Sequence, residues 1–280
     1  MERDVKANAL LCAILIAGCT GNMGNAHRNE ADAKTPTSAP IAVSQSKTAT
    51  QVQVAKQPAA ELNGSLDPSG RLALTTGDMS VVISASDCEV FTDAVSECAD
   101  RVAVSLSREN GRKQVLEPSG LFIDSEATLF RGPLGQRDAT KGHSIVIADV
   151  NGDGREDISL WTGRRGGYGS DSYDVYLSDP ASGRFVHSEP FSELMVGRLG
   201  LFQLEGGKLR LNAKSGCCIH SKEWYEVENN IPVLVERIEE DATGGKDPPK
   251  QTVWRRVDGA MQEIKNLENL KKVSGTISDV

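Results

Sequence analysis

The 280-residue chain is acidic, with 39 Asp and Glu residues against 31 Lys and Arg residues and a formal net charge of −8. An acidic surface repels phosphate backbones, so we expect no nucleic acid among the partners of this protein. The same surface attracts cations and basic proteins.

The first nineteen residues have the pattern of a secretory signal segment. Basic residues precede an apolar run, Ala9 to Ala17, which is too short to cross a bilayer and ends at Gly-Cys. This ending resembles the lipobox of bacterial lipoproteins, which implies a signal peptide at residues 1–18 and a lipid on Cys19. The resemblance places the protein in the periplasm, anchored to a membrane, and Thr20 in place of Asp favours the outer membrane. An ordinary cleaved signal peptide with an incidental cysteine is the alternative.

Residues 19–62 are rich in Ala, Thr, Ser, Gln, Lys and Pro and contain no aromatic residue. Such a stretch cannot bury enough apolar surface to offset the entropy of ordering, so we expect a disordered tether that begins at the lipidated cysteine. Residues 63–280 then form the folded part. Their number suits one all-β domain or two small ones.

Four cysteines follow the signal segment: Cys88, Cys98 and the adjacent pair Cys217 and Cys218. An oxidising periplasm favours disulfides, and sequence alone does not select among the three connectivities. A Cys88–Cys98 bridge closes a short loop and is the preferred pairing. Cys217 and Cys218 are then bonded to each other or free, unless each takes a partner from the first pair. Zinc is a competing interpretation, although Cys217, Cys218 and His220 lack the two-residue gap of paired zinc thiolates.

From Leu72 onward, short runs of Val, Ile, Leu, Phe and Tyr alternate with Gly, Pro, Asp and Asn clusters, which is typical of antiparallel strands. Three segments share an acidic residue, Pro, Ser and Gly before an apolar run: SLDPSGRLAL, VLEPSGLFI and LSDPASGRFV. Each predicts a hairpin corner, because the acidic-Pro pair starts a turn and glycine accepts positive φ. We therefore expect an all-β protein with a propeller-like or irregular antiparallel β fold. The predicted strands are 72–74, 80–84, 102–106, 121–123, 144–148, 157–162, 173–177, 185–187, 209–212 and 233–238.

The C-terminal segment predicts a short amphipathic helix. Apolar residues recur every three positions among Lys, Glu and Asn, at Met261, Ile264, Leu267, Leu270 and Val273. We expect this helix to pack on the sheet or to fray, rather than to bind a partner.

The segment DVNGDGRED predicts a calcium site formed by Asp149, Asn151, Asp153, Arg155 and Asp157. Three carboxylates, one amide oxygen and the main-chain carbonyl of Arg155 are the hard oxygen donors that Ca²⁺ takes. Without a cation the carboxylates would repel one another. The acid at the twelfth position of an EF-hand is missing, and the flanks read as strands. The loop instead resembles the calcium loops of FG-GAP and VCBS-type β-propeller repeats; a polar turn that binds nothing is the alternative.

A glycine-rich loop follows, from Gly163 to Ser172. Its glycines lack phosphate-binding spacing and no strand-to-helix turn is visible, which argues against a nucleotide site. Long loops beside a rigid metal site often make contacts. Because aromatic and arginine residues dominate interface hot spots, the candidate partner-binding residues are Arg164, Arg165, Tyr168 and Tyr173. A merely mobile surface loop is the alternative.

Taken together, the lipobox, the DVNGDGRED loop, the SYDVYLSDPASGRFV hairpin and the GCCIHSKEWYEVENNIPVLVERI segment resemble one family. It is the family of periplasmic calcium-binding lipoproteins that act as immunity proteins in bacterium-killing type IV secretion systems. The resemblance implies a propeller-like β fold that binds calcium at the five loop residues and blocks a secreted peptidoglycan hydrolase, a lysozyme-like effector. It is best over residues 144–238, and the long N-terminal portion and vicinal cysteines depart from the family.

We expect no enzymatic activity, because no catalytic constellation is recognisable. No spacing singles out a carboxylate pair for glycoside hydrolysis, and no nucleophile elbow surrounds a serine. The other alternative is a structural or adhesion-type envelope lipoprotein whose calcium only rigidifies the β fold. A gene for a secreted peptidoglycan hydrolase beside this one would favour the immunity role.

Overall fold

The computed structural model describes residues 59–245 and 248–264, all within one compact unit of the chain, Val52–Val280. The signal peptide, Cys19 and most of the predicted tether lie outside the described residues. The last residues of that predicted tether form a strand, β1 (Ala60–Leu62), which pairs with a strand of the folded part. Ordered structure therefore begins before residue 63.

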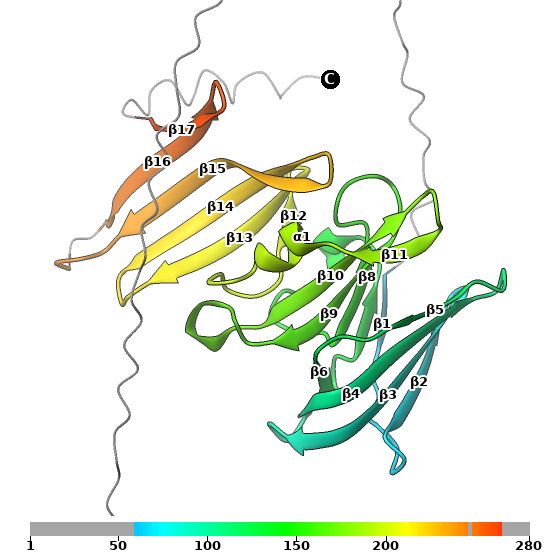
Figure 1. Cartoon of the computed structure of the whole chain (residues 1–280). Helices are drawn as coiled ribbons and strands as arrows, with labels where there is room; N and C mark the ends of the chain where they lie inside the picture. Colours follow the sequence, from blue (N-terminus) through cyan, green and yellow to red (C-terminus); the bar gives the residue numbers. More distant parts are fainter. Residues whose placement is uncertain (1–58, 246–247, 265–280) are drawn as a thin grey trace, which may run out of the picture. The chain divides into compact units, whose positions relative to one another are not determined.

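Three β-sheets make up the described residues (Figure 1), and we call them the N-terminal, central and C-terminal sheets. The N-terminal sheet has the order β2-β3-β4-β5, with β6 also paired to β4: β2 (Arg71–Thr76), β3 (Met79–Val90), β4 (Val95–Arg108), β5 (Lys113–Leu116) and β6 (Leu121–Asp124). The central sheet has the order β1-β7-β8-β9-β10-β11: β7 (Leu129–Arg131), β8 (Ile145–Ala148), β9 (Asp157–Gly163), β10 (Ser172–Asp179) and β11 (Arg184–His187). The C-terminal sheet is a meander in chain order: β12 (Gln203–Glu205), β13 (Lys208–Ser215), β14 (Ile219–Glu228), β15 (Ile231–Asp241), β16 (Lys250–Val257) and β17 (Ala260–Glu263).

Neighbouring strands are antiparallel throughout these sheets, except for β7 and β8, which run parallel. No sheet closes into a barrel within the described part of the chain. The structure confirms the all-β prediction in its irregular, antiparallel form.

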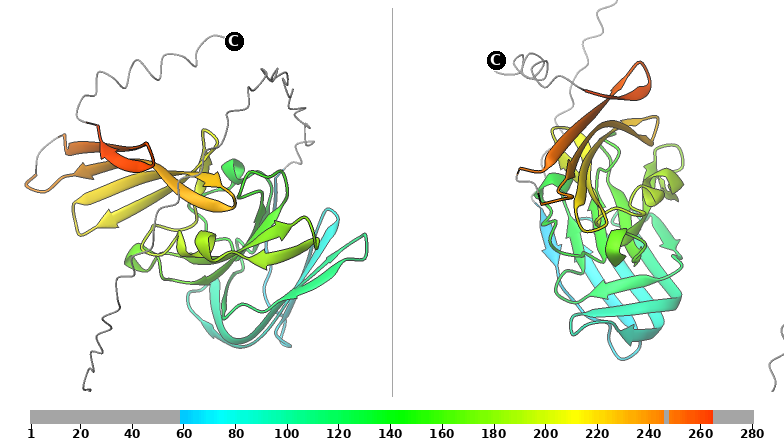
Figure 2. Two further views of the ribbon diagram at one scale, coloured as in Figure 1. Left: turned by 45° about the horizontal axis from the view of Figure 1, so that its top comes forward. Right: turned by 90° about the vertical axis from the view of Figure 1, so that its left-hand side faces the viewer.

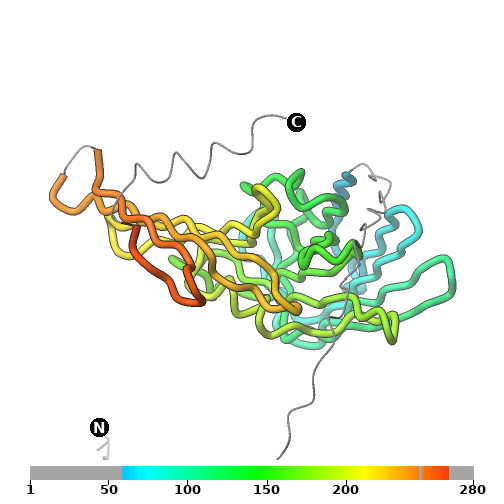
Figure 3. Tube along the Cα trace, turned by 90° about the horizontal axis from the view of Figure 1, so that it is seen from above, coloured from blue at the N-terminus to red at the C-terminus, as the bar shows by residue number. Residues whose placement is uncertain are grey.

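The central sheet is covered on both faces. On β8, Ile145 and Ile147 join one hydrophobic cluster with residues of β3 and β4, while Val146 and Ala148 join a second cluster with residues of the C-terminal sheet. Figures 2 and 3 show the central sheet between the other two. Side chains alternate between the faces of a strand, so a strand covered on both sides is apolar at every position. This accounts for the continuous apolar run of β8.

One of the three predicted hairpin corners joins strands that pair with each other. The LSDPASGRFV segment connects β10 to β11, with Gly183 at φ 66° and the Asp179 carboxylate accepting hydrogen bonds from the N–H groups of Ala181 and Ser182. The VLEPSGLFI segment instead connects β5 to β6, which both pair with β4. The SLDPSGRLAL segment leads from β1 to β2, which belong to different sheets. These two predictions of a hairpin were therefore wrong.

Helical structure differs from the sequence-based expectation. A short helix, α1 (Glu189–Glu193), has Pro190 in its first turn and buries Phe191 in the second hydrophobic cluster. The 3-10 turns η1 (Leu134–Gln136) and η2 (Gly167–Gly169) are the other helical elements of the described residues. Met261, the predicted start of a C-terminal helix, lies in β17 instead, and positions from 265 onward lie outside the described residues. Met261 is held in the sheet by pairing with β16.

Candidate functional site

The DVNGDGRED loop connects the antiparallel neighbours β8 and β9, so its flanks are strands, as the sequence predicts. Gly152 and Gly154 have φ of 79° and 83°, a region that residues with a Cβ rarely adopt. The two glycines thus allow the tight curl that turns the polar side chains inward.

Asp149 folds back over the loop. Its Oδ1 accepts hydrogen bonds from the N–H groups of Gly152 (2.7 Å) and Asp153 (3.2 Å), and its Oδ2 accepts one from the N–H of Gly154 (2.9 Å). The Asp153 carboxylate in turn accepts a hydrogen bond from the N–H of Arg155 (2.8 Å). The loop therefore gathers its acidic side chains over its own backbone.

Asp157 is fully buried at the start of β9. Its two carboxylate oxygens accept hydrogen bonds from the N–H groups of Val150 (3.0 Å) and Ser178 (2.8 Å). Burial, together with the negative charges of Asp153 and Asp149, raises the pKa of Asp157 to about 6, even though the two N–H groups lower it. The Asp149 and Asp153 carboxylates therefore lie near enough to Asp157 to disfavour its charged form.

Asn151 connects the loop to the C-terminal sheet. Its amide Nδ2 donates a hydrogen bond to Oδ1 of Asn230 in the β14–β15 turn (2.9 Å), while its Oδ1 accepts one from the N–H of Asp153 (3.1 Å). The amide oxygen thus faces the loop interior. No local sequence pattern indicates this contact, because the two residues are 79 positions apart.

The donor set fits calcium in its chemistry, although the carboxylate oxygens are occupied by N–H groups in this arrangement. No three His, Cys, Asp or Glu side chains within residues 59–245 and 248–264 are grouped as a metal centre. A cation at this loop would therefore draw Asp149 and Asp153 away from some of their N–H partners.

The glycine-rich loop presents Tyr168 on the surface. Tyr168 is 64% exposed and has φ of 59°, and its hydroxyl donates a hydrogen bond to the carbonyl of Gly216. The ammonium of Lys214 lies 5.2 Å from the centroid of its ring. An exposed aromatic side chain is therefore held in place by the β13–β14 turn.

Arg164 connects the same loop to the N-terminal sheet. Its Nε donates a hydrogen bond to the carbonyl of Gly169 (2.5 Å), and its guanidinium carbon lies 4.8 Å from the ring centroid of Phe91. Phe91 is 41% exposed and follows β3. No sequence motif pointed to Phe91, which lies between the two bonded cysteines of the β3–β4 hairpin.

Two of the predicted partner-binding residues are engaged elsewhere. Tyr173 is 1% exposed and its hydroxyl donates a hydrogen bond to the carbonyl of His143 (3.1 Å), so its selection as a partner-binding residue was wrong. Burial raises the pKa of Tyr173 well above its usual range. The guanidinium of Arg165 forms an ion pair with Glu193 of α1 (3.2 Å) and lies 3.9 Å from Asp174.

The cysteines form two bridges. Cys88 and Cys98 lie directly opposite each other on β3 and β4 and are bonded, which confirms the preferred pairing. Cys217 and Cys218 are bonded to each other in the β13–β14 turn. Both thiols are thus consumed, and the zinc interpretation was wrong.

The chain is similar in sequence and structure to a secretion system related protein. It superposes on a solved structure of a Xanthomonas type IV secretion system related protein with a TM-score of 0.70 and 34% identity, over 75% of this chain and 100% of that chain. Neither the family models nor the curated proteins compared with the sequence contain a match. Among the described residues, no helix has the length and apolar character needed to cross a membrane.

Proposed function

Because this chain belongs to the family of the Xanthomonas type IV secretion system related protein, we propose that it is an immunity lipoprotein of such a system. In this proposal it binds calcium in the periplasm, anchored through Cys19, and inhibits a peptidoglycan-degrading, lysozyme-like effector. The observation that carries the proposal is the similarity over the full length of the related protein. We propose no catalytic role.

We place the inhibitory surface at Phe91, Arg164 and Tyr168. The exposed fractions of Phe91 and Tyr168 are 41% and 64%, and Arg164 bridges their two loops. Aromatic and arginine side chains dominate interface hot spots, and a surface that buries all three on binding would supply most of the binding energy.

The charge of the β3–β4 hairpin, which carries Phe91, favours a basic partner, whereas the Tyr168 side of the surface carries the cations Arg164 and Lys214. The β3–β4 hairpin carries exposed acidic side chains at Asp87, Glu89, Asp93, Glu97 and Asp100. Within residues 87–101, the only cation is Arg101, which pairs with Asp87 (2.6 Å). Complementary charge raises the association rate and selects against acidic partners. A cationic hydrolase fits this pattern.

The surface is rigid before binding, which favours affinity. Phe91 packs edge-on against Phe122, Phe122 stacks on Trp161, and Tyr168 is held by its hydroxyl and by Lys214. Side chains that are already ordered lose less conformational entropy when a partner binds.

The calcium loop and the inhibitory surface lie at opposite ends of β9. The loop ends at Asp157, where β9 starts, and Arg164 follows its last residue, Gly163. A strand of this length spans roughly 20 Å. Calcium in this proposal therefore rigidifies the β8–β9 connection and does not touch the effector.

The test measures inhibition of any peptidoglycan hydrolase that is encoded beside the gene, using the full-length chain with Cys19→Ser so that it carries no lipid. The protein with an unchanged surface should inhibit the hydrolase. Tyr168→Ala and Arg164→Ala should each weaken inhibition about tenfold or more without lowering the melting temperature. Arg256→Ala, on β16 of the C-terminal sheet, is the matched control and should inhibit normally. Full activity of every neighbouring hydrolase in the presence of the protein would remove the proposal.

A further inference from the structure

A small cleft separates the β4–β5 turn from the β10–β11 turn. Its volume is about 230 Å³, and four basic residues and no acidic residue line it: Arg108, Arg112, Lys113 and Arg184. Met79, Leu106 and Phe185 supply apolar surface to the same cavity. The lining of this cleft is thus opposite in charge to the chain as a whole, whose net charge is −8. The adjoining groove, which shares Arg108 and Arg112, is also lined by Glu156 and Asp179.

Three of the four cations have no carboxylate partner among the described residues. Arg108 pairs with Asp78 (3.3 Å) and Glu156 (3.4 Å), whereas no ion pair involves Arg112, Lys113 or Arg184 in residues 59–245 and 248–264. Like charges that converge on one cavity repel unless an anion lies between them.

A larger groove on the C-terminal sheet provides a contrast. Its basic side chains are each paired with an acidic residue of the same groove: Lys208 with Glu226, Arg255 with Glu236 and Arg256 with Glu228. That groove neutralises itself and calls for no charged ligand. The cleft between the turns does not neutralise itself.

The walls of the cleft are fixed by hydrogen bonds. The Gln114 side chain donates to the carbonyl of Phe185 (2.7 Å) and accepts from its N–H (2.8 Å), which fastens β5 to β11. A Cβ at Gly183 would lie 2.5 Å from Nη1 of Arg112, so glycine lets the guanidinium approach the β10–β11 turn. The backbone that carries the cations is therefore fixed at two places that belong to different sheets, while the side chains of Arg112, Lys113 and Arg184 are exposed at the cleft.

We propose that this cleft binds a small organic anion, a carboxylate or a phosphate that carries a short apolar group. Arg112, Lys113 and Arg184 hold the anionic end through charge-assisted hydrogen bonds. Phe185 and Leu106 cover the apolar end. The cavity is smaller than the roughly 300–1,000 Å³ of pockets for drug-sized ligands, which limits the ligand to a few carbon atoms beyond its charged group.

The test titrates hexyl phosphate and hexanoate into the full-length Cys19→Ser chain by calorimetry, with hexanol as the uncharged probe. Either anion should bind, hexanol should not, and binding should weaken as salt is raised. Arg112→Gln combined with Arg184→Gln should weaken binding at least about tenfold, because two charge-assisted contacts are lost. Arg256→Gln, with the same type of charge change on the C-terminal sheet, should bind as the wild type.

A second arm distinguishes the source of the anion. Co-sedimentation with phosphatidylglycerol vesicles that the double variant abolishes would identify a lipid headgroup, and binding of the soluble probes alone would identify a free acid or phosphate ester. The proposal is overturned if neither soluble anion gives heat and no vesicle binding occurs, or if hexanol binds as well as the anions. It is also overturned if the double variant, with an unchanged melting temperature, binds as tightly as the wild type.

Discussion

The guanidinium carbon of Arg164 lies 4.8 Å from the ring centroid of Phe91, so the glycine-rich loop of the central sheet covers the β3–β4 hairpin of the N-terminal sheet. Phe91 meets Phe122 edge-on at 5.6 Å between centroids, and Phe122 stacks on Trp161 at 4.9 Å. Phe122 and Trp161 are 4% and 5% exposed. A row of aromatic rings thus runs from the hydrophobic core to the surface.

This row predicts that its members differ in their effect on stability. Phe122→Ala removes a buried ring from between two others and should lower the free energy of unfolding by about 3–5 kcal/mol. Phe91→Ala, at a half-exposed position, should lower it by only about 1 kcal/mol. Urea unfolding followed by tryptophan fluorescence measures both. Equal losses would show that Phe91 is part of the core rather than of a surface supported by it.

The loss of Arg131 should lower the stability of the fold, because two carboxylates lose their nearest cation. The Arg131 side chain is 7% exposed and contacts Asp78 (2.7 Å) and Glu156 (2.6 Å), which ties the β2–β3 turn to the central sheet. Arg131→Met leaves both carboxylates with only the longer contacts to Arg108 and should lower the free energy of unfolding by about 3 kcal/mol at pH 7. Arg131→Lys should lose less, since an ammonium restores charge but not the forked geometry.

The pH dependence of the stability lost in Arg131→Met is the control for this prediction. The hydrogen bond from Arg131 holds the pKa of Asp78 below its usual 3.8. This lowered pKa contributes stability that is present above pH 3.8 and is lost as the pH falls through the folded-state value. The difference between wild type and Arg131→Met should therefore shrink in acid. A difference that stays constant down to pH 3 would mean that packing, and not charge, is responsible.

The fold could be predicted where burial follows the local pattern. The apolar segments predicted as strands at 144–148, 157–162 and 173–177 correspond to β8, β9 and β10, which both outer sheets cover. β14 was missed because it reads as polar. Its Glu223 is 3% exposed, and it is buried because Arg198 and the Tyr225 hydroxyl donate to it, both at 2.7 Å. No local sequence pattern indicates that Glu223 has these partners in the folded protein.

In the candidate site, too, the local features could be predicted and the long-range contacts could not. The loop from Asp149 to Asp157 could be predicted because its donors are close in sequence and its shape depends on its own glycines. The burial of Tyr173 was also encoded, since Tyr173, Val175 and Leu177 alternate on one face of β10 and all three are buried. Phe91 could not be found, because its neighbour Arg164 is 73 positions away and belongs to another sheet.

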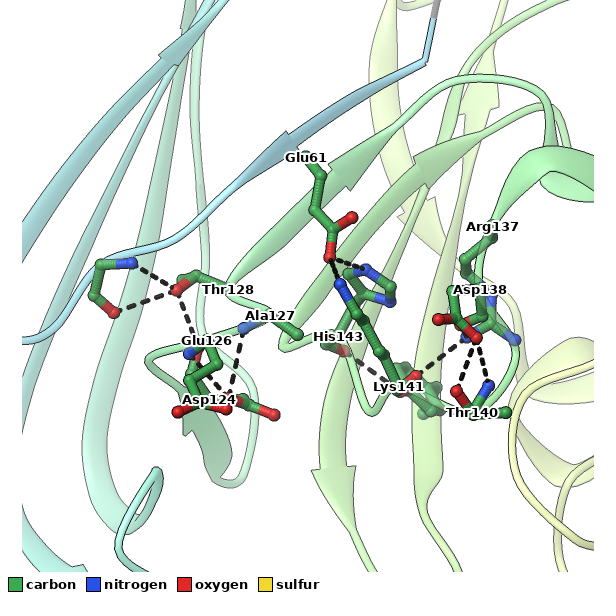
Figure 4. A network of polar contacts seen from close by, with 12 residues as sticks. Glu61, Asp124, Glu126, Ala127, Thr128, Arg137, Asp138, Thr140, Lys141 and His143 are labelled. Atoms are coloured by element: carbon green, nitrogen blue, oxygen red, sulfur yellow. Dashed lines mark hydrogen bonds and ion pairs between the residues drawn. The ribbon is translucent and has the colours of Figure 1, made fainter.

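The buried His143 should make the protein less stable as the pH falls below 6.5. Figure 4 shows its ring beside the Glu61 carboxylate, which also contacts Lys141; the distances from Glu61 are 3.3 Å to Nε2 of His143 and 2.5 Å to Nζ of Lys141. Burial of the imidazole, and then the charge of Arg137, lower the pKa of His143 from 6.5 despite the attraction of Glu61. Below pH 6.5 the imidazole binds a proton more readily in the unfolded chain than in the folded chain, so stability should fall as the pH falls.

The variant His143→Gln should remove this part of the pH dependence. Melting temperatures from pH 7.5 to 5 should drop more steeply for the wild type than for the variant, whatever the absolute stability of the variant. Parallel curves would show that the imidazole takes up its proton equally well in both states.

The two disulfides predict unequal contributions. In the chain-entropy description, the Cys88–Cys98 bridge closes a loop of about ten residues and stabilises by about 2–3 kcal/mol, whereas a bridge between adjacent residues contributes about 1 kcal/mol. Cys88→Ser with Cys98→Ser should therefore cost more than Cys217→Ser with Cys218→Ser. Chemical unfolding of the two double variants makes the comparison. The opposite order would mean that the vicinal pair stabilises the β13–β14 turn through folded-state contacts.

The proposed calcium site predicts that the protein is more stable with calcium than without it. At a calcium concentration 100 times the dissociation constant, binding stabilises a folded chain by about 2.7 kcal/mol. For a domain of this size that is a rise in melting temperature of about 5–10 °C. Asp153→Ala removes one of the predicted ligands and should abolish most of this rise, while Asp93→Ala, with the same change of charge in the β3–β4 turn, should keep it.

Measurements in the presence of a chelator test the same site without its ion. With chelator, Asp153→Ala should melt close to the wild type, because the loss of the hydrogen bond from the Arg155 N–H is offset by weaker repulsion of the buried Asp157. The effect of the substitution should therefore appear only when calcium is added, which scanning calorimetry with and without the ion can measure. A wild-type melting temperature that is the same in calcium and in chelator would mean that the loop is held by its backbone N–H groups alone. A large loss for Asp153→Ala in chelator would assign the carboxylate a structural role that needs no cation.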